Sequence, residues 1–219
     1  MRHLKSTKLL ALAFLGIISS KAQAQFTAGN VVVYDISTST GSSTSSVLRE
    51  FSPAGTAGTT ITVPTSGVGR LTNSGSAVLE GSLTRSSNGQ NLAFAGYDAP
   101  TGVALIEGSL SAVYNRVVDT VNRFGVLGRA DSTLAYSGVG IYGAARSVLN
   151  TWGAGVAPTF SNGGLQYLGN QNPENNVYNA ATIREAKVIG TTLYGVTATS
   201  LSQFGTALPF APTTPTTPR

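Results

Sequence analysis

The strongest constraint on the fold is a turn signal before the middle of the chain. Asn88-Gly89 lies between two segments, 79–85 and 91–97, in which apolar and polar residues alternate. The central residues of a two-residue hairpin turn adopt a positive φ, which Asn and Gly tolerate better than other residues. The segments on either side of the turn are therefore predicted to be antiparallel strands.

Other segments rich in β-branched and aromatic residues are bounded in the same way by Gly, Asn, Ser or Pro. Short strands between frequent turn signals are typical of all-β sandwiches, barrels and propellers. A chain rich in Gly, Ser and Thr can also be disordered, but the aromatic and aliphatic segments argue against that. Further strands are predicted at 31–35, 47–51, 59–63, 103–106, 112–121, 141–145, 149–152, 164–168 and 187–196, with loops at 37–46, 67–76 and 170–176.

A weak internal repeat supports a propeller-like arrangement. An aromatic residue among small residues and Gly recurs at Phe94, Tyr142 and Tyr194, at separations of 48 and 52 residues, with a related run around Tyr167. A period near 50 residues with four short strands matches one blade of a β-propeller of kelch-like length. Because Gly is common in this chain, chance is the competing explanation.

Residues 1–24 have the three parts of a secretory signal peptide. Residues 1–8 are positively charged, 9–18 are apolar, and 22–24 (Ala-Gln-Ala) place small residues at a cleavage site. The apolar part is shorter than the about 20 residues that a transmembrane helix needs, although a membrane anchor or an ordinary N-terminal helix is the alternative. We expect a bacterial protein that is secreted, periplasmic or at the cell surface, with no transmembrane span in the mature chain.

The predicted mature chain has two parts. Residues 25–208 are expected to form one all-β domain. Residues 209–219 are rich in Pro and Thr and are expected to form an extended linker or stalk that adds nothing to a sheet.

The residue types and the charge of the predicted mature chain exclude several functions. Four of the 14 Lys and Arg residues and the only His lie in residues 1–24, which leaves ten basic and nine acidic residues, and the chain has no Cys. Histidine acid–base catalysis, Cys nucleophiles, disulfides and zinc sites built on His or Cys are therefore excluded. The near-neutral charge also removes the argument for nucleic acid as a partner.

No cofactor or metal is predicted. The segment 138–143 matches G-x-G-x-x-G, but no acidic residue lies between Asp131 and Glu174, where a dinucleotide site would need one. A Gly-rich strand and turn is the better interpretation. No phosphate-binding loop motif and no D-x-[DN]-x-[DN]-G calcium loop occurs in the sequence.

Four segments carry a resemblance to a known group: 26–34, 80–98, 163–167 and 187–194. They resemble uncharacterised secreted bacterial proteins that look like β-propellers, in which a Ser-x-Asp/Asn-Gly hairpin precedes the strand leading into the next blade. The resemblance covers most of 26–208 and implies an all-β fold of propeller-like blades. The mature chain has room for about four blades, whereas such propellers have about six to eight. A truncated reading frame or fragment, a ring completed by a partner and a different all-β fold are the alternatives.

Candidate ligand-binding residues are few. Arg146 and Arg184 follow apolar residues, and Trp152 is the only tryptophan. An Arg near aromatic rings can bind a sugar acid or another carboxylate, and Asp98 closes the hairpin unit. Asp98, Arg146, Trp152 and Arg184 are therefore the predicted ligand-binding residues. The competing interpretation is a turn cap for Asp98, local ion pairs or solvent exposure for the arginines, and a core position for Trp152.

Two functions remain open from the sequence. The first is an exported non-enzymatic binding or scaffold module whose partner is an extracellular polysaccharide or protein. The alternative is a carbohydrate-active enzyme, or a fragment of one, that uses two carboxylates, because glycoside hydrolysis needs no histidine. Spacing alone cannot pair any two of the acidic residues Asp35, Glu50, Glu80, Asp98, Glu107, Asp119, Asp131, Glu174 and Glu185. A third option is the product of an incomplete gene.

Overall fold

The structure of the chain, a computed structural model, describes residues 25–39, 41–157, 162–169 and 175–218. These residues form an all-β fold with a single turn of 3-10 helix, η1 (Ile106–Gly108). The predicted all-β class is confirmed. The predicted signal peptide, 1–24, lies outside the described residues. Within the described ranges, no helix is long and apolar enough to cross a membrane.

In the described residues the strands form five antiparallel sheets, of which we number the four larger ones I to IV in chain order. Sheet I contains β1 (Val31–Ile36), β3 (Ser46–Phe51) and β4 (Ala57–Thr62). Sheet II contains β6 (Thr84–Arg85), β7 (Asn91–Tyr97), β8 (Arg116–Asn122) and β9 (Leu127–Thr133). Sheet III contains β10 (Ile141–Arg146), β11 (Thr151–Gly155), β12 (Leu165–Gly169) and β13 (Asn175–Tyr178). Sheet IV contains β14 (Glu185–Ile189), β15 (Thr192–Val196), β16 (Leu201–Phe204) and β17 (Pro215–Thr216). A small ribbon pairs β2 (Ser43–Thr44) with β5 (Asn73–Ser74).

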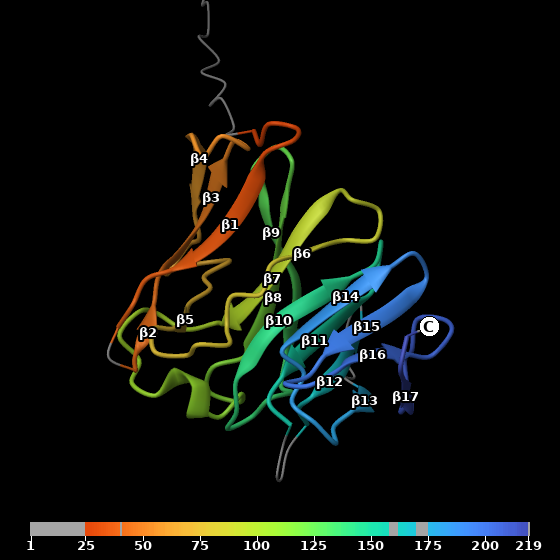
Figure 1. Cartoon of the computed structure of the whole chain (residues 1–219). Helices are drawn as coiled ribbons and strands as arrows, with labels where there is room; N and C mark the ends of the chain where they lie inside the picture. The colour runs from red at the N-terminus through yellow and green to blue at the C-terminus, as the bar shows by residue number, and fades with distance from the viewer. Residues whose placement is uncertain (1–24, 40, 158–161, 170–174, 219) are drawn as a thin grey trace, which may run out of the picture.

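Consecutive sheets pack on one another through three apolar clusters. Leu48, Phe94 and Val117 belong to the cluster between sheets I and II. Val118, Ile141 and Leu168 belong to the cluster between sheets II and III. The cluster between sheets III and IV includes Trp152, Leu165, Val188, Leu193 and Phe204. Figure 1 shows the sheets side by side in chain order, from the orange strands to the blue ones. This stacking of small antiparallel sheets is consistent with incomplete propeller-like blades.

The first strands of sheets II, III and IV lie together along an inner edge. The Ser82 backbone NH donates to the Tyr142 carbonyl at 3.2 Å, and the Ser87 NH donates to the Arg146 carbonyl at 3.0 Å. The segment 82–87 therefore runs parallel to β10, which also contacts β14. Gly143 permits this approach, because a Cβ there would lie 2.5 Å from the Ser82 Cβ.

The predicted hairpin is confirmed, with one difference. β7 matches the predicted strand 91–97, and Gly89 adopts the expected positive φ of 70°. Of the predicted strand 79–85, only Thr84–Arg85 is paired. Residues 79–83 leave the sheet because the Glu80 side chain binds groups on β5 and β7.

One predicted strand is wrong and others need correction. Residues 103–106 lead into η1, because the Val103 NH donates to the Ser43 hydroxyl and Leu105 adopts a left-handed conformation. The predicted strand 187–196 is a hairpin that turns at Gly190, where φ is 59°. Neither β9 nor β16 was predicted, and β13 begins inside the predicted loop 170–176, whose first five residues lie outside the described ranges.

The four-stranded unit is present in sheets II, III and IV, but the aromatic repeat does not mark it consistently. Phe94 and Tyr194 lie on the second strands of their sheets, β7 and β15. Tyr142 lies on the first strand, β10, and Tyr167 lies on the third, β12. The predicted period was therefore close to the spacing of the sheets, although its markers occupy different positions in them.

The expectation that the Pro/Thr-rich tail adds nothing to a sheet is wrong for Pro215–Thr216. These residues form β17 at the edge of sheet IV, paired with Gln203 and Phe204 on β16. An edge strand tolerates Pro because it needs hydrogen bonds on one side only. The Thr213 NH also donates to the Val177 carbonyl, at 2.9 Å.

Candidate functional site

A cavity of about 450 Å³ opens near the beginnings of β6, β10 and β14, the first strands of sheets II, III and IV, which we call the inner strands. Leu79 precedes β6, Tyr142 lies on β10, and Arg184 lies just before β14. The opposite wall is made of small and hydroxyl side chains, namely Ala181, Thr182, Thr197, Ala198 and Thr199. We call this cavity the Tyr142–Arg184 pocket. Its volume falls within the range of about 300–1,000 Å³ that is usual for small-molecule sites.

The backbone on both sides of the pocket is fixed by hydrogen bonds. The Thr197 hydroxyl accepts from the NH groups of Thr199 and Ser200, at 3.2 and 3.0 Å, and so closes the turn between β15 and β16. The Arg184 NH donates to the Val196 carbonyl at 2.7 Å. The Arg184 side chain is exposed, and within the described ranges its guanidinium forms no salt bridge.

A buried polar network begins directly behind the pocket, at the residue after Leu79. Glu80 Oε1 accepts from the Tyr97 hydroxyl at 2.6 Å, and Oε2 accepts from the Ser74 NH at 2.8 Å and from Asn73 Nδ2 at 3.3 Å. The Tyr34 hydroxyl donates to Asn73 Oδ1 at 2.6 Å. Tyr34, Asn73, Glu80, Tyr97 and Arg116 are called the polar network from here on.

Arg116 is the member of this network whose side chain is charged and fully buried. Its guanidinium lies 5.0 Å from the centre of the Tyr97 ring. It donates to the carbonyls of Glu107, Ser109, Tyr114 and Val139, at 3.1, 2.7, 3.0 and 2.9 Å. Burial lowers the pKa of Arg116, whereas Tyr97 and the carboxyls of Glu80 and Glu107 raise it. An arginine remains charged under such conditions.

The pKa of Glu80 is shifted into the neutral range. Burial raises the pKa of Glu80 to about 7, against the opposing effect of the hydrogen bonds from Tyr97, Ser74 and Asn73, and the charge of Glu107 raises it further. Perturbed carboxyls of this kind occur often at functional sites, although structural networks produce them too. Glu80 therefore changes charge near neutral pH.

Tyr142 connects the pocket with both carboxyls. Burial raises the pKa of Tyr142, the charges of Glu107 and Glu80 raise it further, and Arg184 lowers it. A Cβ on Gly140 would lie 2.8 Å from Glu107 Oε1 and 3.1 Å from Tyr142 Cε1. The Glu107 carboxyl and the Tyr142 ring therefore lie against the same glycine, at the start of sheet III.

Of the four residues predicted from the sequence, the pocket contains Arg184. Asp98 pairs with Arg70, whose Nε lies 2.6 Å from the Asp98 carboxylate. Arg146 Nη1 donates to the Thr151 hydroxyl at 2.9 Å. Trp152 is fully buried, and its Nε1 donates to the Pro209 carbonyl at 2.8 Å. Binding of a ligand by any of the four remains a prediction.

Sequence reasoning missed Tyr142 and did not single out Glu80 or Glu107. Tyr142 was recognised as part of the aromatic repeat, and both acidic residues were among the nine considered. Glu80 is distinguished by the hydrogen bond that it accepts from Tyr97, 17 residues further along the chain, and Glu107 and Tyr142 are distinguished by lying against Gly140. No local spacing could have revealed these contacts.

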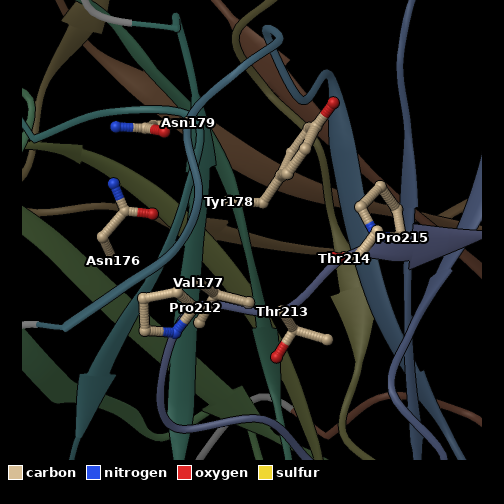
Figure 2. A pocket seen from close by; sticks show the side chains of 8 residues that line it. All are labelled: Asn176, Val177, Tyr178, Asn179, Pro212, Thr213, Thr214 and Pro215. Atoms are coloured by element: carbon tan, nitrogen blue, oxygen red, sulfur yellow. The ribbon is translucent and has the colours of Figure 1, made fainter.

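Two further cavities differ from this pocket. The first, of about 280 Å³, lies between β13 and the C-terminal tail and is lined by Asn176–Asn179 and Pro212–Pro215, none of them charged (Figure 2). The second, of about 600 Å³, lies at the N-terminal segment and is considered below. In the part of the chain that the structure describes, no group of three acidic side chains could hold a metal ion.

Comparison of the chain with protein-family models, with curated proteins and with solved structures finds no match.

Proposed function

We propose that the protein is an exported, non-enzymatic binding module whose ligand occupies the Tyr142–Arg184 pocket. The observation that carries this proposal is the convergence of one aromatic ring, one guanidinium without a salt bridge in the described residues, and a wall of threonines around a single cavity. Guanidinium groups bind carboxylates, and hydroxyl groups bind sugar hydroxyls. A polysaccharide that contains sugar acids is the ligand that fits this combination.

The placement of the Glu80 carboxylate favours binding without turnover. The Glu80 oxygens accept three hydrogen bonds from protein groups, and Glu80 is not among the residues that line the pocket. A catalytic acid or base must reach the proton that it transfers, at about 2.6–3.2 Å. Glu80 supports the wall that carries Leu79 rather than facing a ligand.

The proposal can be tested by affinity electrophoresis of the full exported protein in gels that contain polygalacturonate. We expect the polysaccharide to retard migration of the wild type. Arg184→Gln should weaken the apparent affinity at least tenfold, and Arg184→Lys should keep part of it. Arg49→Gln is the matched control, because Arg49 is an exposed arginine in sheet I, paired with Asp35. Equal retardation of the wild type and Arg184→Gln would contradict the proposal, and a loss with Arg146→Gln alone would move the site to Arg146.

A second candidate function rests on a separate observation, the electrostatic coupling of Glu80 with Glu107. A carboxyl whose pKa is raised to about 7, in part by the charge of a second carboxyl, is one feature of the acid–base pair that a glycoside hydrolase uses. Release of reducing sugars from polygalacturonate, lost in both Glu80→Gln and Glu107→Gln, would favour this enzyme over the binding module. We expect no such release.

A further inference from the structure

A second cavity lies at a different place from the Tyr142–Arg184 pocket, and the two share no lining residue. It has a volume of about 600 Å³ and is bounded by the N-terminal segment 25–30 and by parts of sheets II and IV. Arg85 ends β6, and Lys187 is the third residue of β14, so both lie further along the inner strands than Leu79 and Arg184. We call it the basic cavity.

Three cations from separate elements converge on the basic cavity. Arg85 comes from β6, Arg123 from the turn between β8 and β9, and Lys187 from β14. No acidic residue lines the cavity, and within the described ranges none of the three cations forms a salt bridge. Like charges that gather without a counter-charge repel one another, and such a cleft attracts anions.

Two of the cations are held in place before any ligand arrives. Arg85 Nε and Nη2 donate to the Gly89 carbonyl at 3.3 and 3.2 Å, so the guanidinium lies against the hairpin turn. The Arg123 guanidinium lies 4.4 Å from the centre of the Phe124 ring, and the Arg123 carbonyl accepts from the Phe26 NH at 2.9 Å. Positioned charges lose less conformational entropy when they bind a ligand.

The N-terminal wall is fixed by Glu50, a buried carboxylate with 2% of its surface exposed. It accepts from Asn30 Nδ2 at 2.9 Å, from the Thr59 NH at 3.0 Å and from the Thr27 NH. Burial alone would raise the pKa of Glu50, but these hydrogen bonds lower it to about 2. The Glu50 oxygens therefore bind the loop and do not face the cavity, where they would neutralise its cations.

Side-chain amides surround the three cations. Gln25, Asn30, Gln90, Asn91 and Asn122 line the basic cavity, together with the apolar side chains of Phe26 and Leu83. Amides hydrogen-bond to hydroxyl groups as donors and acceptors, and arginines bind carboxylate or sulfate oxygens. We propose that the basic cavity binds an anionic oligosaccharide, whose carboxylate or sulfate groups contact Arg85, Arg123 and Lys187 and whose hydroxyls contact the amides.

The test measures binding of defined probes to the full exported protein by isothermal titration calorimetry. An oligogalacturonate carries carboxylates, and a heparin-derived oligosaccharide of the same length carries sulfates as well. We expect the double variant Arg85→Gln/Lys187→Gln to weaken binding of at least one probe tenfold or more. The affinity of the wild type should fall when NaCl is raised from about 50 to 300 mM, because salt screens exposed charges. Arg49→Gln, which removes one exposed charge from sheet I, should bind as the wild type does.

The outcomes separate this site from the Tyr142–Arg184 pocket. Binding that is lost in Arg184→Gln and kept in Arg85→Gln/Lys187→Gln would overturn this inference and leave the proposed function intact. Equal binding of single-stranded DNA and both oligosaccharides would also overturn it, because the cavity would then attract any polyanion. The double variant should unfold at the wild-type temperature or above it, since it relieves repulsion. A lower unfolding temperature would show that the cations serve the fold instead.

Discussion

Sheet II packs against its neighbours partly through ionisable side chains, whereas sheets III and IV pack through apolar ones. The polar network buries a guanidinium, a carboxyl and two phenols around β7 and β8. The cluster between sheets III and IV consists of aliphatic and aromatic side chains. The same stacking of sheets is thus stabilised by two kinds of interior, and only the first one responds to pH.

Three aromatic rings pack together in the apolar interior between sheets III and IV. The Trp152 ring lies 5.6 Å from Tyr167 and 6.1 Å from Phe210, and Tyr167 lies 4.8 Å from Phe210, as measured between ring centres. The Trp152 Nε1 bond to the Pro209 carbonyl attaches the C-terminal tail to this group. The tail is therefore part of the packing of sheets III and IV.

The largest effect is expected for Trp152→Ala. The variant should lower the free energy of unfolding by about 3–5 kcal/mol, because it removes a fully buried ring and leaves a cavity. The loss should be the same at pH 5 and pH 8, since no titratable carboxyl belongs to this cluster. Urea unfolding followed by fluorescence or circular dichroism measures both values. A loss that changes by more than about 1 kcal/mol between the two pH values would contradict the comparison.

Arg116→Met should come next, with a loss of about 3 kcal/mol. The methionine keeps much of the volume but leaves four carbonyls, those of Glu107, Ser109, Tyr114 and Val139, without their donor. Arg116→Lys should recover part of the loss, because an ammonium reaches some of the same oxygens. If Arg116→Met is as stable as the wild type in urea, the buried charge contributes nothing to the fold.

Glu80→Gln should change the pH dependence of stability more than stability itself. The folded pKa of about 7 lies above the usual value of 4.5, so the wild type loses stability as pH rises from about 4.5 to 7. The loss is on the order of 2 kcal/mol when partial solvent screening is allowed for. Burial also raises the pKa of Asp119, to about 6, so Asp119 likewise lowers stability as the pH rises, but mostly below pH 6. The change in stability between pH 6 and 8 therefore reports mainly on Glu80.

The unfolding temperature of Glu80→Gln should therefore stay nearly constant between pH 6 and 8, whereas that of the wild type should fall as the pH rises. The titratable groups around Glu80 are Tyr34, Tyr97, Arg116, Tyr142 and Glu107, and neither the three tyrosines, whose pKa values are raised, nor Arg116 titrates in this interval. A wild type whose unfolding temperature does not fall between pH 6 and 8 would mean that Glu80 is already ionised in the fold.

The sequence was sufficient to predict part of the local structure, but not to predict which residues meet. The Asn88-Gly89 turn follows from local backbone preferences and was predicted correctly, as was the strand 91–97. The strand predicted at 79–83 was wrong because Glu80 turns toward Ser74 and Tyr97. Contacts of this kind depend on tertiary packing, which overrides local propensity.

The same limit applies to the candidate site. Arg184 was recognisable as an arginine near apolar residues, and the structure places it beside a cavity. Arg116 lies in a segment, 112–121, that was predicted to be a strand, yet its burial has no local signal, because Asn115 before it and Val117 after it do not show which side of the strand is covered. A fully buried arginine becomes predictable only once the carbonyls of η1 and of the chain before β10 are known to surround it.

The smallest effects come from a matched pair of hydroxyl deletions, Tyr34→Phe and Tyr167→Phe. The Tyr34 hydroxyl is buried and bonds to Ser46 Oγ at 2.8 Å and to Asn73 Oδ1 at 2.6 Å, so its loss leaves a buried acceptor unpaired and should cost about 1 kcal/mol. The Tyr167 hydroxyl donates to Asn150 Oδ1 at 2.9 Å in a partly exposed position, where water can replace it, and should cost less than about 0.5 kcal/mol. Both values come from urea unfolding at one pH. Because the two substitutions remove the same atom, equal losses would mean that the interior between sheets I and II and the interior between sheets III and IV do not differ in their dependence on polar contacts.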